Sequence, residues 1–204
     1  MSEIMSEVET TASETPAPPA SSGGRIAIFG IGLSLGALLA WGTLLALLVL
    51  LALGLSRSQK GPVSKGEQAP EFLLATFSGE EIRMADLRGK VVVINFWASW
   101  CKPCEQEAAD LEAAWRQYKP GGQVVFLGVD YVDTESEALG YLEKFDITYP
   151  NGPDLGTRIS QAYRIRGVPE TFFVDQSGKL VQFQKGPFSS LSQITAVIDP
   201  LLED

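Results

Sequence analysis

The sequence contains no histidine and only two cysteines among its 204 residues. Without histidine, the chain lacks the most frequent general base of enzymes and the most frequent metal ligand. A structural zinc site takes four cysteine or histidine ligands, and this chain has two cysteines to offer. We therefore expect neither a metal ion nor a cofactor, and we expect no histidine-based catalysis.

Basic residues are also fewer than acidic residues. The chain has 16 lysines and arginines against 25 aspartates and glutamates, which gives a formal net charge of -9. Phosphate contacts require a basic surface, so this composition argues against nucleic-acid binding. The hydrophobic share of 45% is ordinary for a folded protein, and the length suits one globular domain with additional segments.

The N-terminal third divides into three parts. Residues 1–24 are rich in Glu, Ser, Thr, Pro and Ala, and they are predicted to form a disordered acidic tail. Residues 26–55 carry no charge and lie between Arg25 and Arg57. A bilayer requires roughly 20 apolar residues, so we expect a transmembrane anchor over residues 25–56. A buried core helix and a cleaved signal peptide are the alternatives, but a signal peptide normally has a much shorter apolar region. We favour an uncleaved signal-anchor.

Residues 57–67 are predicted to be a polar linker, and residues 68–204 a globular domain. One basic residue precedes the apolar run, whereas Arg57, Lys60 and Lys65 follow it. Read literally, the positive-inside rule would place the domain in the cytoplasm, although the charge bias is small.

The two cysteines occur together, in Trp100-Cys101-Lys102-Pro103-Cys104. An apolar run at 91–96 precedes them and predicts a strand, and a helical pattern follows. Cys101 is therefore expected at a helix N-terminus, where the helix dipole lowers the pKa of a thiol and favours the nucleophilic thiolate. Cys104, about one helical turn later, could close a disulfide with it. A purely structural disulfide over so short a loop would stabilise little, so we predict redox chemistry.

The remaining pattern predicts an α/β fold with a mixed sheet and helices on both faces. Strands are expected at 72–74, 81–83, 91–97 and 124–129, an extended segment at 147–149, and an antiparallel hairpin at 171–174 and 180–184. Helices are expected at 102–118, 135–145, 158–163 and 189–202.

Three segments together carry a family resemblance: Gln68-Ala69-Pro70-Glu71-Phe72, residues 93–104 around the cysteines, and residues 167–175, which read Gly-Val-Pro-Glu-Thr-Phe-Phe-Val-Asp. Over residues 67–204 the chain resembles the thioredoxin superfamily, and within it the membrane-anchored TlpA/ResA/CcmG (DsbE) branch. The resemblance implies a thioredoxin-like fold and a thiol–disulfide oxidoreductase on the cell membrane, with its C-terminal domain outside the cytoplasm. It further implies a disulfide-bearing protein substrate such as apocytochrome c, whose Cys-x-x-Cys is reduced during cytochrome c maturation, and a membrane thiol electron donor.

The resemblance also assigns site residues beyond Cys101 and Cys104. Pro169 corresponds to the cis-proline of the family, and the backbone of the preceding Val168 would pair with a substrate chain. Glu107 corresponds to a glutamate that could pass a proton to Cys104, although an ordinary charged residue in a first helical turn would look the same. Asn95 stands where cytosolic thioredoxins have a buried aspartate.

Two tryptophans and a lysine lie near the two cysteines or between them. We expect Trp97 in the core and Trp100 beside the dithiol as a substrate-binding surface. Lys102 would either favour the thiolate or be an ordinary solvated lysine.

Three other functions are open from the sequence. One is a general extracytoplasmic disulfide reductase. Another is a peroxide-linked redoxin, although a peroxiredoxin would require a threonine where this chain has Ala98. The third is a non-catalytic thioredoxin-fold binding module.

Overall fold

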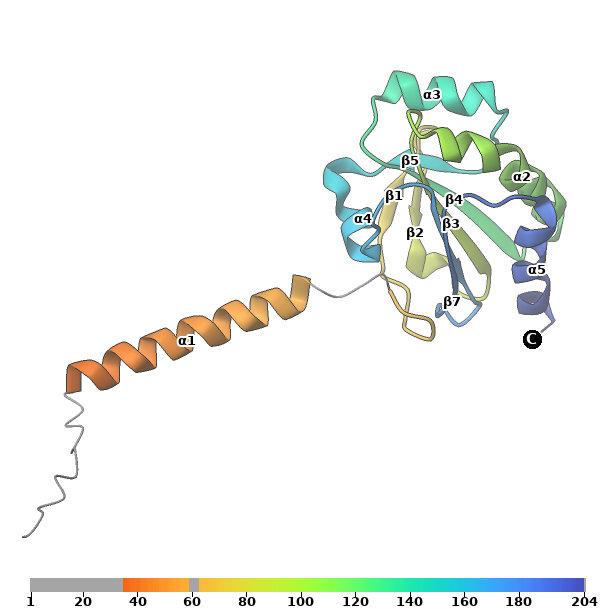
Figure 1. The fold of residues 1–204 in the computed structure, drawn as a ribbon. Coiled ribbons are helices and arrows are strands. Elements are labelled where there is room, and N and C mark those ends of the chain that lie inside the picture. The colour runs from red at the N-terminus through yellow and green to blue at the C-terminus, as the bar shows by residue number, and fades with distance from the viewer. Residues whose placement is uncertain (1–34, 59–62, 204) are drawn as a thin grey trace, which may run out of the picture. The chain divides into compact units, whose positions relative to one another are not determined.

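The structure is a computed structural model that describes residues 35–58 and 63–203 (Figure 1). The predicted tail at 1–24 lies outside the described residues. Helix α1 (Leu35–Ser58) has 24 residues, and its described leucine side chains are exposed. Within residues 35–58 and 63–203, no helix combines the length and the apolar character that crossing a membrane requires.

A five-stranded mixed sheet forms the centre of the domain, with the strand order β5-β4-β3-β6-β7. Strands β3 (Val91–Trp97), β4 (Val124–Asp130) and β5 (Asn151–Pro153) run parallel to one another. Strands β6 (Glu170–Val174) and β7 (Leu180–Lys185) form an antiparallel hairpin, and β6 pairs antiparallel with β3. The predicted mixed sheet is confirmed, with β3 in the middle.

Strand β3 is buried along its whole length because both faces of the sheet are covered. Alternate side chains of a strand point to opposite faces. Val92, Ile94 and Phe96 therefore enter one core cluster, while Val91, Val93 and Trp97 contribute to clusters on the other face. Val, Ile and Phe suit such a strand, since branched and aromatic side chains pack well on a pleated surface.

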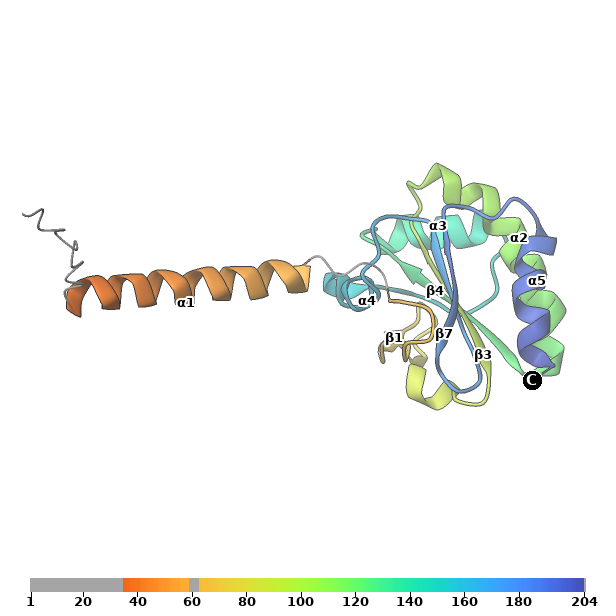
Figure 2. The same ribbon diagram turned by 60° about the horizontal axis from the view of Figure 1, so that its bottom comes forward.

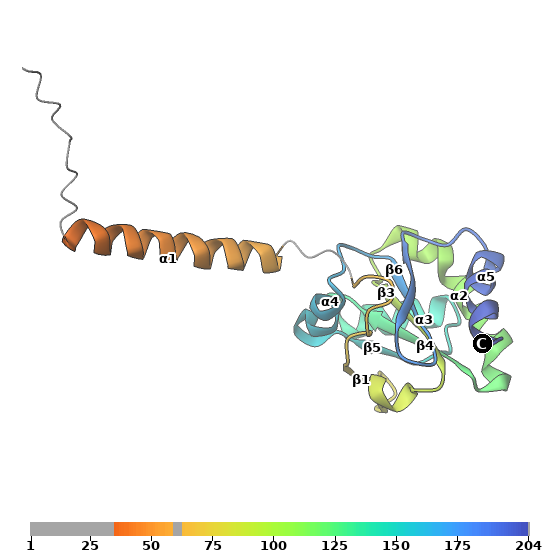
Figure 3. The same ribbon diagram turned by 90° about the horizontal axis from the view of Figure 1, so that it is seen from below.

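Helices cover the two faces unequally. On one face lie α2 (Lys102–Tyr118) and α5 (Leu191–Leu202), with α3 (Glu135–Lys144) beside α2 (Figure 2). On the other face lie α4 (Arg158–Tyr163) and the small hairpin of β1 (Leu73–Ala75) and β2 (Glu81–Arg83) (Figure 3). Short 3-10 segments occupy Met84–Leu87, Lys119–Gly121 and Leu155–Thr157.

The segment at 147–149, predicted to be extended, does not join the sheet. Residues 147–149 form no strand, and β5 begins only at Asn151. The reason lies in competing hydrogen bonds, because the amide of Ile147 donates to Leu142 O and that of Thr148 to Glu112 Oε2. Pairing with β4 starts at Asn151, opposite Gly128.

The domain also reaches further toward the N-terminus than residue 68. Val63 is buried in the core, and the amide of Gly66 donates to Leu180 O at the start of β7. The amide of Leu180 in turn donates to Glu67 O. These contacts fix residues 63–67 against the sheet.

Candidate active site

The two cysteines lie where β3 leads into α2. Cys101 is the N-cap of α2, with extended backbone angles, and its Sγ accepts a hydrogen bond of 3.2 Å from the amide of Cys104. Pro103 lies in the first turn, where a missing amide hydrogen costs no helical hydrogen bond. A disulfide joins Cys101 to Cys104, with 5.3 Å between their Cα atoms. The structure therefore represents the oxidised form.

The two sulfur positions differ in access and in electrostatics. Cys101 is 4% exposed and Cys104 only 1%, so the first cysteine is the more accessible. At the N-cap, the Cys101 sulfur also accepts a hydrogen bond from the Cys104 amide and lies at the positive end of the helix dipole, and both favour its thiolate. Both properties suit Cys101 as the attacking sulfur and Cys104 as the resolving one.

Lys102 behaves as a surface lysine. Its side chain is 80% exposed, and its Nζ pairs with Glu105 Oε1 at 2.9 Å. Lys144 of α3 approaches the same oxygen at 3.3 Å. These cations hold the pKa of Glu105 below its ordinary value. Because the charge of Lys102 is compensated by a carboxylate, its expected support of the thiolate is weak.

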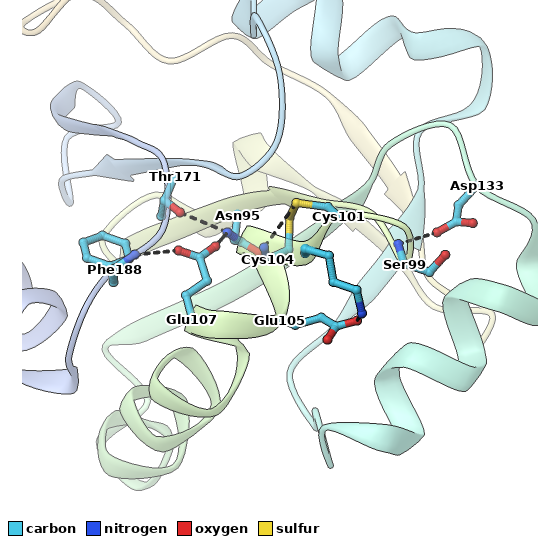
Figure 4. Close-up of a disulfide and its surroundings, with 10 residues drawn as sticks. Asn95, Ser99, Cys101, Cys104, Glu105, Glu107, Asp133, Thr171 and Phe188 are labelled. Carbon is cyan, nitrogen blue, oxygen red and sulfur yellow. Dashed lines mark hydrogen bonds and ion pairs between the residues drawn. A yellow bond between two sulfur atoms is a disulfide. The ribbon is translucent and has the colours of Figure 1, made fainter.

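Glu107 lies deep behind the disulfide, in a network that connects helix α2 with the sheet (Figure 4). It is 1% exposed. Its Oε1 accepts a hydrogen bond of 2.8 Å from Asn95 Nδ2, and its Oε2 accepts one of 3.0 Å from the amide of Phe188. Asn95 also donates to Thr171 Oγ1 at 3.0 Å, which extends the network to β6.

Burial raises the pKa of Glu107 to about 7, and the hydrogen bonds from Phe188 and Asn95 only partly oppose this shift. The residue is therefore not an ordinary solvated glutamate of a first helical turn. A carboxyl group that titrates near neutral pH can both take and give a proton there. Its place three residues after Cys104 puts the two residues on the same side of α2, and its role in proton transfer stays a prediction.

The loop before Cys101 is held by the loop after β4. The amide of Ser99 donates to Asp133 Oδ2 at 2.6 Å, and Trp100 Nε1 donates to Val132 O at 3.1 Å. Trp100 is 59% exposed, as expected of a surface beside the dithiol. Trp97 is buried, and its ring stacks on Tyr141 with centroids 4.4 Å apart, which confirms its placement in the core.

The Val168–Pro169 peptide bond is cis, as the resemblance implied. Both residues line a groove of about 380 Å³ that also includes Pro103, which lies between the two cysteines in the sequence. The structure thus brings together the cysteines, the cis-proline and Val168 at one end of the sheet, with Trp100 on the preceding loop.

Sequence reasoning missed several residues of this site. The amide of Phe188 carries no side-chain signal at all. Thr171 was assigned only to a strand, although its position opposite Asn95 in the sheet register places the two side chains together. Asp133 could have been found, since the carboxyl ends of neighbouring parallel strands meet at one edge of a sheet.

Nothing in the described part of the chain gathers three or more His, Cys, Asp or Glu side chains in a metal-binding arrangement. A helix-capping cysteine, a resolving cysteine and a buried acid that titrates near pH 7 can together perform thiol–disulfide exchange.

Comparison with known proteins gives a consistent set of relatives. The profile of the AhpC/TSA family matches residues 65–183. The chain is 34% identical over 149 residues to the thiol-disulfide oxidoreductase ResA of Geobacillus thermodenitrificans, a match that covers 71% of this chain and 85% of that protein. It is 34% identical over 125 residues to ResA of Bacillus cereus, covering 61% and 72% respectively.

A solved structure gives a similar relative. A thiol:disulfide interchange protein of the thioredoxin family from Chlorobium tepidum superposes with a TM-score of 0.62 at 25% sequence identity, covering 69% of this chain and 99% of that one. The predicted thioredoxin-like fold is confirmed.

Proposed function

Because the chain belongs to the AhpC/TSA family, with a Cys-x-x-Cys pair at the start of α2, we propose that it is a thiol–disulfide oxidoreductase that reduces disulfides in other proteins. The observation that carries this proposal is the position of Cys101. It caps a helix, it is the more accessible cysteine, and it lies one turn from a partner that already forms a disulfide with it.

The reaction starts from the reduced protein. The Cys101 thiolate attacks one sulfur of the substrate disulfide, and the other substrate sulfur leaves as a thiolate that takes up a proton. Cys104 then loses its proton and attacks the Cys101 sulfur, which breaks the mixed disulfide and releases the second substrate thiol. Two electrons pass to the substrate, and the protein ends with the Cys101–Cys104 disulfide.

Two parts of the site assist these steps. Glu107, whose pKa burial raises to about 7 and which lies three residues after Cys104 on α2, would accept the proton that Cys104 must lose. Val168, before the cis-proline, would offer its backbone to an extended substrate segment, and Trp100 would offer an exposed aromatic surface next to Cys101. These roles are inferred from geometry and from the family resemblance.

We further propose a place for the reaction: the protein acts at the cell membrane, single-pass, with its domain outside the cytoplasm. The uncharged run at residues 26–55 supports an anchor, and part of it lies outside the described residues. In an oxidising compartment a reductant needs a source of electrons, so a membrane thiol donor would reduce the disulfide again. The Cys-x-x-Cys of apocytochrome c is the proposed substrate, as the resemblance to the ResA and CcmG branch implies.

Insulin reduction in the presence of dithiothreitol tests the general activity. The wild-type protein should accelerate precipitation of the insulin B chain, whereas Cys101→Ser should not. Cys104→Ser should retain its substrate as a mixed disulfide, which a reductant should cleave. Trapping by Cys101→Ser in place of Cys104→Ser would reverse the assignment of the two cysteines. An inactive wild-type protein would instead favour a binding module.

The location and the substrate need separate experiments. An impermeant thiol reagent, added to intact cells after mild reduction, should label Cys101, and labelling only after lysis would refute the orientation. A disulfide-bonded Cys-x-x-Cys-His peptide should be reduced faster than insulin. Equal rates would favour a general extracytoplasmic reductase.

A further inference from the structure

The groove beside the cis-proline is lined by two cations and one acid, in a protein whose net charge is -9. Its lining combines Pro103 of the active-site loop, residues 166–170 around the cis bond, and residues 185–187 after β7. Arg166 and Lys185 are the cations among these residues, and both are exposed. The chain as a whole carries a net charge of -9, so a positively charged groove at the dithiol stands out against it.

Within the described part of the chain, neither cation forms a salt bridge. Lys102 and Arg116 have carboxylate partners within 3 Å. Among residues 35–58 and 63–203, no salt bridge involves Arg166 or Lys185. Their charges are therefore available to a ligand in the groove.

One acid lies beneath them. Glu170 follows the cis-proline directly and is 1% exposed. Its Oε1 accepts a hydrogen bond of 3.1 Å from the amide of Arg166, which holds the loop in place, while its Oε2 has no hydrogen-bond partner in the described structure. Burial raises the pKa of this carboxyl group, and the charges of Lys185 and Arg166 oppose the shift. Even when Glu170 is ionised, its single charge offsets only one of the two cations, and the groove stays positive.

From this arrangement we infer that the groove recognises acidic substrate segments: the enzyme prefers disulfides whose neighbouring residues carry carboxylate side chains, which Arg166 and Lys185 bind. The inference rests on the proposed function, because it assumes that a substrate chain lies along Val168 and Pro169 with its disulfide at Cys101. A segment held there extends over the groove, within reach of both cations. Glu170 acts as a positioning residue, since its bond to the Arg166 amide fixes the loop that presents this cation.

The test uses three disulfide-bonded Cys-x-x-Cys peptides that differ only in the flanking residues, which are glutamate, glutamine or lysine. The full-length reduced protein should show a kcat/KM for the glutamate peptide about two- to tenfold above that for the glutamine peptide, as expected for one or two exposed ion pairs. The lysine peptide should be the poorest of the three. The preference should shrink as salt rises, because exposed charges are screened.

The double variant Arg166→Gln/Lys185→Gln should lose the preference and reduce all three peptides at about the same rate. Lys179→Gln is the matched control, because Lys179 is exposed at the other end of β7, and this variant should keep the preference. Equal rates for all peptides with wild type, or a preference for lysine, would overturn the inference and leave the proposed function intact. Failure to reduce any peptide would overturn both.

Discussion

Replacing Glu107 with glutamine removes a buried charge and keeps the size of the side chain. In the oxidised protein, burial raises the pKa of Glu107 from its ordinary value of 4.5 to about 7. The folded state therefore favours the protonated acid more strongly than the unfolded state does. Its contribution to stability is fully present below pH 4.5 and is lost as the pH rises through about 7.

The size of this effect follows from the shift. A change of one pKa unit corresponds to about 1.4 kcal/mol, so a shift from 4.5 to about 7 is of the order of 3 kcal/mol. The hydrogen bonds to Asn95 and Phe188 require two acceptors. Glutamine has one carbonyl oxygen to accept these hydrogen bonds, and so does a protonated carboxyl group. Glu107→Gln and the protonated wild type should therefore have similar stabilities.

Chemical unfolding of the oxidised protein between pH 5 and pH 8 measures the difference. At pH 5 the unfolding free energies of wild type and Glu107→Gln should agree within about 1 kcal/mol, and at pH 8 the variant should be more stable by about 3 kcal/mol. Glu105→Gln is the control on the same helix, and it should not change the pH trend over this range because the pKa of Glu105 is lowered. A constant difference between wild type and Glu107→Gln across the range would refute the buried, titrating Glu107.

The same variant separates stability from chemistry. If Glu107 moves the proton of Cys104, Glu107→Gln should slow disulfide exchange and shift the pKa of a cysteine although the fold is intact. Unchanged thiol titrations and an unchanged exchange rate would remove Glu107 from the mechanism. Cys101, Cys104 and Pro169 would then remain as the proposed active set.

Three further substitutions test the packing and the site. Leu111→Ala on the buried face of α2 should lower the unfolding free energy by about 2–5 kcal/mol, and a loss below 1 kcal/mol in denaturant titrations would contradict its place in the core. Asp130→Asn should stabilise the protein more at pH 8 than at pH 5. The reason is that burial raises the pKa of Asp130 to about 7, and the nearby Asp133 and Asp154 add to the shift. A stabilisation that does not change with pH would refute this. Trp100→Ala should lower kcat/KM for protein disulfides more than for a small disulfide without lowering the melting temperature, and an equal loss on both would argue against a substrate-binding surface.

The sequence was a good guide where local pattern decides structure. The predicted helix at 102–118 matches α2, since the N-capping position of Cys101, Pro103 in the first turn and a clear apolar stripe all favour the same boundaries. The uninterrupted apolar run at 91–97 likewise matches β3. Local signals did not show that the extended segment at 147–149 would stay outside the sheet, because the amide of Thr148 donates to a glutamate side chain 36 residues away in sequence. No local pattern contains that competition.

In the active site, too, some features could be predicted from the sequence, and others depend on contacts between distant parts of the chain. The Cys-x-x-Cys motif locates the dithiol, and the family resemblance supplied Pro169 and Glu107. Whether Glu107 was buried could not be decided from its helix alone, because its environment depends on Asn95 from β3 and on the amide of Phe188 between β7 and α5. The groove charge was equally hidden, since Arg166 and Lys185 come together only through the pairing of β6 with β7.

The reduction potential of the Cys101/Cys104 couple tests the central claim most directly. The potential can be measured by equilibrating the protein with glutathione or dithiothreitol buffers and counting free thiols. A protein that reduces disulfides should have a potential near the reducing end of the thioredoxin-like range, at about -270 mV. A potential near about -120 mV would mark a strong oxidant and would contradict the proposed reductase.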